Sequence, residues 1–122
     1  MHQSDERQQF LHGIEQFNRR EFFETHETWE AIWLAAPEPD KTFLQGIIQI
    51  ACAFHHYLRG NRAGARSLLR RGLEKVERFP TDYRGMNVAR LRKTASWWRE
   101  ELDAGRNPRP DKLPTIVEAP PG

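Results

Sequence analysis

The sequence predicts an all-α protein, and three features support that fold class. Apolar residues recur at helical spacing along almost the whole chain, and no segment alternates apolar and polar residues as a half-buried strand does. Asparagine, glycine and proline stand where helices would begin and end. The 122 residues include four tryptophans and seven phenylalanines, enough for one folded domain. We therefore expect a single-domain antiparallel bundle of about five helices over residues 1–105, followed by an extended Pro-rich tail over residues 106–122.

The first two helices are expected on either side of a short break at residues 18–20. Ser4 is a suitable N-cap for the first helix, with acidic residues just after it, where a carboxylate stabilises the helix dipole. The second helix is expected over about residues 21–36, and the prolines that follow end it. Each helix has a side rich in apolar and aromatic residues: Phe10, Ile14 and Phe17 in the first, and Phe22, Trp29 and Trp33 in the second.

The third helix, over about residues 41–59, is apolar on nearly every side, which is typical of a central, buried helix. Asp40 is a suitable N-cap for it. Gly60 fits the left-handed position that ends this helix, and Asn61 fits the N-cap of a fourth helix over about residues 62–79. So short a connection predicts that the third and fourth helices are antiparallel neighbours.

The fifth helix is expected to begin after Asn87 and to end at Gly105. Its apolar residues follow the three-and-four spacing of a bundle seam: Val88, Leu91, Ala95, Trp98 and Leu102. No regular element is predicted over residues 81–86. The proline-rich tail is expected to rest on the bundle through three apolar residues: Leu113, Ile116 and Val117.

Composition excludes several classes of protein. No apolar stretch reaches the roughly 20 residues of a membrane helix, and the polar residues 1–7 show no apolar core of a secretory signal. The single cysteine, Cys52, allows no internal disulfide, which is typical of proteins in a reducing compartment. We therefore expect a cytoplasmic protein with no membrane partner.

One segment places polar side chains where the packing face of the second helix is expected. At about 100° per residue, His26, Glu30 and Glu27 fall on the same arc as the large aromatic residues of that helix. The third helix carries a narrow polar stripe: Gln45, Gln49, Cys52 and His56. Antiparallel packing would bring the two sets together inside the protein, where a charge without a partner is costly.

Three interpretations of this cluster stay open. His26, Glu30 and His56 are candidate ligands for a divalent metal such as Zn²⁺, Mn²⁺ or Fe²⁺. The segment reads His-Glu-x-x-Glu, however, which is neither the His-Glu-x-x-His of zincins nor the Glu-x-x-His of di-iron bundles. A buried glutamate and a nearby histidine also suit acid–base or metal-assisted hydrolytic chemistry. The third interpretation is a fully satisfied hydrogen-bond network that only fixes the packing of the helices.

The charges are unevenly distributed between the two halves of the chain. Residues 1–58 contain four basic and nine acidic residues, and residues 59–122 contain 15 basic and eight acidic ones. Four arginines of the second half follow one helical face: Arg59, Arg62, Arg66 and Arg70. A phosphate backbone would suit that face, but no aromatic residues interleave with the arginines. A solvated face, paired with the acidic half, is therefore favoured over nucleic-acid binding.

Two longer motifs resemble a known family. The first is Phe-Asn followed by Phe-Phe-Glu-x-His-Glu-x-Trp-Glu-x-x-Trp, within residues 17–33, and the second begins Phe-Leu-Gln-Gly-x-Ile-Gln within residues 43–65. Together they resemble domain-of-unknown-function family 309 (DUF309) over about residues 8–75. The resemblance implies an all-α bundle and no established activity. Its polar motif positions correspond here to seven residues: Glu24, His26, Glu27, Glu30, Gln45, Gln49 and His56.

The leading functional hypothesis is a polar pocket between the second and third helices that binds a small ligand or a divalent metal. The alternative is a helical module that holds a protein or a nucleic acid through the arginine face, with the polar cluster purely structural. The sequence identifies no substrate, cofactor or partner, and it is compatible with a homo-oligomer.

Overall fold

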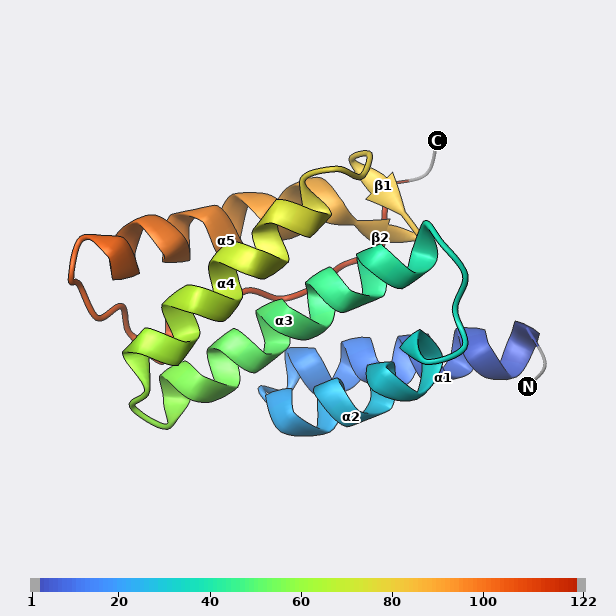
Figure 1. Cartoon of the computed structure of the whole chain (residues 1–122), viewed down its shortest axis with the longest axis horizontal. Coiled ribbons are helices and arrows are strands. Elements are labelled where there is room, and N and C mark those ends of the chain that lie inside the picture. The colour runs from blue at the N-terminus through green and yellow to red at the C-terminus, as the bar shows by residue number, and fades with distance from the viewer. Residues whose placement is uncertain (1–2, 121–122) are drawn as a thin grey trace.

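The computed structural model describes residues 3–120, with side chains from residue 5, and most of these residues are helical. Five α-helices follow one another along this part of the chain: α1 (Gln3–Asn18), α2 (Phe22–Trp33), α3 (Asp40–Leu58), α4 (Arg62–Val76) and α5 (Val88–Asp103). In Figure 1, α3 lies between the α1–α2 pair on one side and the α4–α5 pair on the other. The prediction of an all-α helical bundle is confirmed.

The predicted connection between α3 and α4 is confirmed. Gly60 has a φ of 81°, in the left-handed region that favours glycine. The Asn61 side chain accepts a hydrogen bond from the Gly64 backbone N–H at 3.0 Å, so it caps α4. In the same way, Asn87 caps α5 by accepting from the Arg90 backbone N–H at 3.0 Å. Short-range polar chemistry therefore determines where both helices begin.

Two other cap predictions are wrong. Asp40 is the first residue of α3 and not its cap, because Pro39 holds that position. The Asp40 carboxylate instead accepts hydrogen bonds from the Tyr83 hydroxyl and the Arg84 guanidinium, far along the chain. Ser4 lies within α1 and not before it, and its side chain lies outside the described part of the structure.

The core is centred on α3, as its apolar sequence predicts. Phe43, Leu44, Ile47 and Ile50 of this helix are fully buried. The predicted seam of α5 is buried as well, from Val88 to Leu102 at the predicted spacing. Although α3 is 19 residues long, neither it nor any other helix within residues 3–120 is long and apolar enough to cross a lipid bilayer.

Glycines allow α3 and α4 to approach closely. A Cβ atom built on Gly72 would lie 2.7 Å from the backbone oxygen of Gly46 and 2.8 Å from Cγ1 of Ile50. Because one of these neighbours is backbone, it cannot move aside without shifting the helix. Gly46 and Gly72 therefore allow the short distance between α3 and α4.

Gly72→Ala is expected to destabilise the protein by about 1–3 kcal/mol. The cost is a forced separation of α3 and α4, partly offset because alanine favours the helix by about 1 kcal/mol relative to glycine. Urea unfolding followed by circular dichroism measures it. Glu74→Ala, on the exposed side of the same helix, is the control and should stay within about 0.5 kcal/mol of the unaltered chain. Equal stability of the two variants would contradict the close-approach argument.

A small hairpin occupies the segment where no regular element was predicted. Strands β1 (Asp82–Tyr83) and β2 (Met86–Asn87) pair antiparallel. The two residues between them, Arg84 and Gly85, have φ values of 52° and 74°. Two central residues with positive φ are typical of the tightest hairpin turns, which asparagine or aspartate before glycine usually signals. An arginine in that position gives no such signal, so the turn could not be predicted from the sequence.

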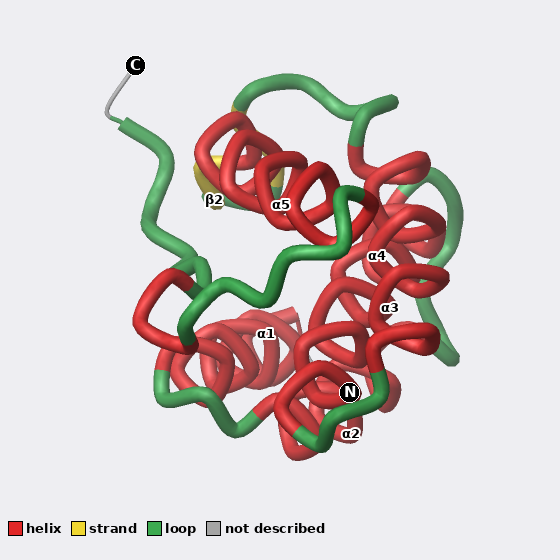
Figure 2. The backbone as a smooth tube through the Cα atoms, turned by 90° about the vertical axis from the view of Figure 1, so that its left-hand side faces the viewer, coloured by secondary structure: helices red, strands yellow, loops and turns green. Residues whose placement is uncertain are grey.

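The C-terminal segment fills a space between α5 and α1, as Figure 2 shows. It contains a short 3-10 helix, η1 (Pro110–Lys112). Leu113 and Ile116 are buried, which confirms that they hold the segment on the bundle. Asn18 at the end of α1 donates to the Ile116 carbonyl at 2.9 Å and accepts from the Ile116 N–H at 2.7 Å. The side-chain amide of Asn18 thus binds both backbone groups of Ile116 and holds the tail at the end of α1.

Candidate functional site

The packing face of α2 is narrower than the sequence suggested. It buries residues at three-and-four spacing: Phe22, Thr25, Trp29 and Ile32. His26 lies at the edge of that face with 29% of its side chain exposed, and Glu30 is 49% exposed. Glu27 is exposed too. The prediction that both glutamates lie on the packing face is therefore wrong. The cause is that the aromatic residues of α2 do not share one face, since Phe23 is 47% exposed.

Two small cavities lie between α2 and α3, one after the other along the two helices. One, of about 160 Å³, is lined by Glu30, Trp33, Gln45, Ile48 and Gln49. The other, of about 240 Å³, is lined by Phe23, His26, Cys52, His55 and His56. Nε2 of His26 lies 2.8 Å from Oε2 of Glu30, so a close polar contact joins the two linings. We call the two cavities together the α2–α3 groove; Figure 1 shows the two helices side by side.

Some of the predicted site residues line the α2–α3 groove in the structure, and others do not. The polar stripe of α3 borders the groove along its whole length: Gln45 and Gln49 at one end, Cys52 and His56 at the other. From α2, His26 and Glu30 reach the groove. Glu24 and Glu27 are exposed on α2 and line neither cavity. The groove is therefore built mainly on α3.

The predicted hydrogen-bond network does not form across the groove. Trp29 donates its indole N–H to the carbonyl of Phe10, away from α3. The buried Nε1 of Trp33 has no hydrogen-bond partner among the described residues. Gln49 accepts from Lys75 of α4 at 2.9 Å. The contact between His26 and Glu30 lies within α2, so none of these polar groups is joined to the facing helix.

The candidate metal ligands are not brought together. His26 and Glu30 form one pair, while Nδ1 of His56 lies 3.1 Å from Nδ2 of Asn61. Within residues 3–120, no three histidine, cysteine, aspartate or glutamate side chains lie close enough to hold a metal ion. Among the described residues, His26, Glu30 and His56 therefore do not form one cluster of metal ligands.

Burial and charge shift two titratable groups of the groove. Burial, helped by the charge of Glu30, raises the pKa of the Cys52 thiol to about 11. The thiol thus stays protonated at neutral pH and is a poor nucleophile. The pKa of His55 is lowered, first by burial and then by Arg59 and His56, with Glu24 acting in the opposite direction. Protonation of the His55 ring is therefore disfavoured in the groove.

Sequence reasoning missed two residues that shape the larger cavity. The ring of Phe23 lies 5.5 Å from that of His55 and 6.0 Å from that of His26, measured between centroids. The predicted site residues included His56 and not its neighbour His55. One signal for it was available, because His55 lies seven residues, about two turns, after Ile48 and so shares its side of α3. Ile48 borders the smaller cavity.

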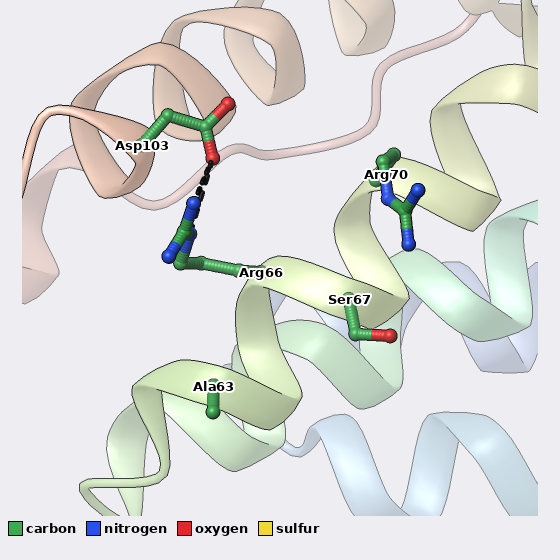
Figure 3. Close-up of a pocket in the computed structure, with 5 residues that line it drawn as sticks. All are labelled: Ala63, Arg66, Ser67, Arg70 and Asp103. Atoms are coloured by element: carbon green, nitrogen blue, oxygen red, sulfur yellow. Dashed lines mark hydrogen bonds and ion pairs between the residues drawn. The ribbon is translucent and has the colours of Figure 1, made fainter.

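The arginine face of α4 is only partly free. Arg62 donates to the Asn107 side chain and to the carbonyls of Leu102 and Arg106, so it holds the chain that follows α5. Figure 3 shows a surface hollow between α4 and α5, in which Arg66 is joined to Asp103 at 3.0 Å while Arg70 stays outside the pair. Arg59 and Arg70 are exposed. The predicted stripe is thus interrupted by two arginines with structural partners.

Comparison with known proteins finds a family model that matches part of the chain. Residues 10–68 match the model of the family described as Domain of unknown function (DUF309). The predicted resemblance to DUF309 is confirmed. The DUF309 segment runs from within α1 to within α4, and it contains every residue that lines the α2–α3 groove.

Two relatives are described as uncharacterized proteins. One, from Aquifex aeolicus, is 29% identical over 77 residues, which cover 62% of this chain and 23% of the relative. The other, YpuF of Bacillus subtilis, is 33% identical over 75 residues, which cover 59% of this chain and 43% of the relative. The chain thus matches less than half the length of either relative, and DUF309 carries no assigned function.

Proposed function

We propose that the α2–α3 groove binds a small organic ligand. The observation that carries this proposal is the chemistry of the larger cavity, in which one phenyl ring and three imidazoles surround about 240 Å³. An apolar cavity of about 150 Å³ is enough to bind benzene. The larger cavity therefore suits a single aromatic ring with one substituent. Apolar walls with a few polar groups are typical of small-molecule sites.

The smaller cavity adds hydrogen-bonding groups to the same groove. Gln45 and Gln49 contribute amides, and Trp33 contributes an indole whose buried N–H lacks a partner among the described residues. A buried donor without an acceptor is uncommon in folded proteins. A ligand longer than one ring would extend past the pair of His26 and Glu30 and meet the amides of Gln45 and Gln49.

The groove is a better candidate than the arginine face of α4. Arg62 and Arg66 are each engaged by partners within the chain, as described above. Only Arg59 and Arg70 of the predicted stripe stay outside such contacts in the described structure. A ligand site bounded by two helices thus has more support than a phosphate-binding face.

The proposal includes a cytoplasmic location. Cys52 is a free thiol, and it is the single cysteine of the chain. Free, partly buried thiols persist most readily in a reducing compartment.

Titration of the ¹⁵N-labelled chain with indole tests the groove. We expect a Kd of roughly 0.1–1 mM, as usual for ligands of this size. Amide shifts should centre on Phe23, His26 and Cys52, whose side chains line the larger cavity. Cys52→Leu, which fills part of that cavity, should weaken binding, whereas Ser67→Leu on the outer surface of α4 should not. Shifts centred on another part of the molecule, or none at 10 mM indole, would refute the proposal.

A further inference from the structure

We infer that the larger cavity of the α2–α3 groove selects an aromatic ligand that carries an acidic group. The inference rests on the proposed function and specifies its ligand. His26, His55 and His56 supply imidazoles to the lining, and no carboxylate stands among the lining residues. An imidazole that donates an N–H binds an anionic oxygen more strongly than a neutral one. The exposed ring of Phe23 offers a surface for the aromatic part of such a ligand.

The charges around this cavity come from three neighbouring elements. On α2, Glu30 is paired with His26, while Glu24 acts on His55 from an exposed position. On α3, Arg59 follows His55 by one turn and acts on it with the opposite sign. On α4, Lys75 donates a hydrogen bond to the Gln49 side chain, at the other end of the groove.

The combined effect of these charges at His55 is that of a positive charge, which favours an anion in the cavity. Arg59 outweighs Glu24 at His55, and the neighbouring His56 and His26 act in the same direction as Arg59. A bound anion would offset the burial and repulsion that disfavour protonation of His55. Binding of an acid and uptake of a proton are therefore expected to favour each other.

The N-cap of α4 sets the hydrogen-bonding role of His56. Oδ1 of Asn61 accepts from the Gly64 backbone N–H, so the amide orientation is fixed by the cap. Its Nδ2 group then faces Nδ1 of His56 at 3.1 Å and donates to it. A neutral His56 must consequently carry its hydrogen on Nε2. This nitrogen is the remaining donor of a ring that lines the cavity, and we propose that it donates to the acidic group of the ligand.

A matched pair of ligands separates this inference from the proposed function. Benzoate and benzamide have nearly the same shape, but only benzoate carries a charge. At pH 6 we expect benzoate to bind the unaltered chain roughly 10-fold more tightly, as for one charged hydrogen bond. Between pH 6 and pH 8 benzoate stays ionised, and its affinity should fall at least about 5-fold as the linked proton is lost. The affinity of benzamide should stay constant.

A histidine variant then locates the acidic group. His56→Phe, which keeps a ring and removes the donor, should weaken benzoate roughly 10-fold and change benzamide much less, and His12→Phe, exposed on α1, should change neither. Phenyl phosphate, measured beside benzoate, shows whether the site prefers a carboxylate or a phosphate. Equal binding of benzoate and benzamide to the unaltered chain would overturn the inference and leave the groove as a neutral ligand site. Binding of neither at 10 mM, with no indole shifts, would overturn the proposed function as well.

Discussion

Trp98→Ala is expected to destabilise the protein by about 3–5 kcal/mol, and Trp97→Ala by less than about 1 kcal/mol. The two residues are adjacent in α5, but Trp98 is 0% exposed and Trp97 is 40% exposed. The same substitution therefore removes a buried indole at one position and a surface indole at the other. Few pairs of neighbouring positions test the packing of the bundle so directly.

The large cost arises because Trp98 joins three segments. Its ring meets Phe54 and Tyr57 of α3 edge to face, with centroids 5.4 and 4.9 Å away. Its indole N–H donates to the carbonyl of Lys112 in the C-terminal segment at 2.8 Å. Alanine would leave a cavity between α3 and α5 and a carbonyl without its donor. A loss of that size is a large part of the 5–15 kcal/mol that holds a typical domain together.

Urea unfolding followed by far-ultraviolet circular dichroism measures both variants without depending on tryptophan fluorescence. Trp98→Phe separates packing from hydrogen bonding, since it retains a ring and loses the N–H donor. It should lie between the unaltered chain and Trp98→Ala. Similar losses for the two alanine variants would show that Trp98 does not join the three segments as described.

Helices could be predicted from the sequence because their signals are local. Asn61 and Asn87 cap the helices that they precede, and Gly60 has the left-handed conformation that ends α3. A cap needs only residues within one turn of itself. The prediction fails at Asp40 for the complementary reason, because its carboxylate is engaged by the hairpin more than 40 residues later.

The candidate site could be predicted on one helix and not on the other. On α3 the polar stripe stands out, since almost every other side of the helix is apolar and buried. On α2 the packing face was predicted from the positions of the aromatic residues. Glu27 and Glu30 were consequently assigned to the interior. In the structure, however, Phe23 and Trp29 lie on different faces. An aromatic residue that lines a groove looks the same in sequence as one that fills a core.

Arg84 gave no sequence signal and yet joins two carboxylates from distant parts of the chain. Its guanidinium lies 2.5 Å from Asp40 and 2.7 Å from Glu6, and it stacks over the ring of Phe10 at 4.6 Å. These partners lie 44 to 78 residues away along the chain. No local pattern reports contacts over such separations. They form only when the hairpin, α1 and the start of α3 are already close together.

Arg84→Met is expected to destabilise the protein by about 2–3 kcal/mol. The arginine side chain is 12% exposed, whereas Glu6 and Asp40 are 39% and 34% exposed. Breaking a fully buried ion pair costs about 3–5 kcal/mol, and water that reaches the two carboxylates reduces that figure. Methionine keeps an apolar side chain of similar length but removes the guanidinium, and with it both ion pairs and the stacking on Phe10. Thermal and urea unfolding at pH 7 measure the effect.

The cost should come from the carboxylates left without a partner, and a second substitution tests that origin. Asp40→Asn removes one of those charges, so in the double variant with Arg84→Met the loss should be smaller than the sum of the two single losses by about 0.5–3 kcal/mol. Arg90→Met, an exposed arginine of α5 with no ion pair in the described structure, controls for the loss of a positive charge and should change stability by less than about 0.5 kcal/mol. Additive losses would instead mean that Arg84 stabilises the fold through its contact with Phe10, and that the hairpin is held by packing and not by charge.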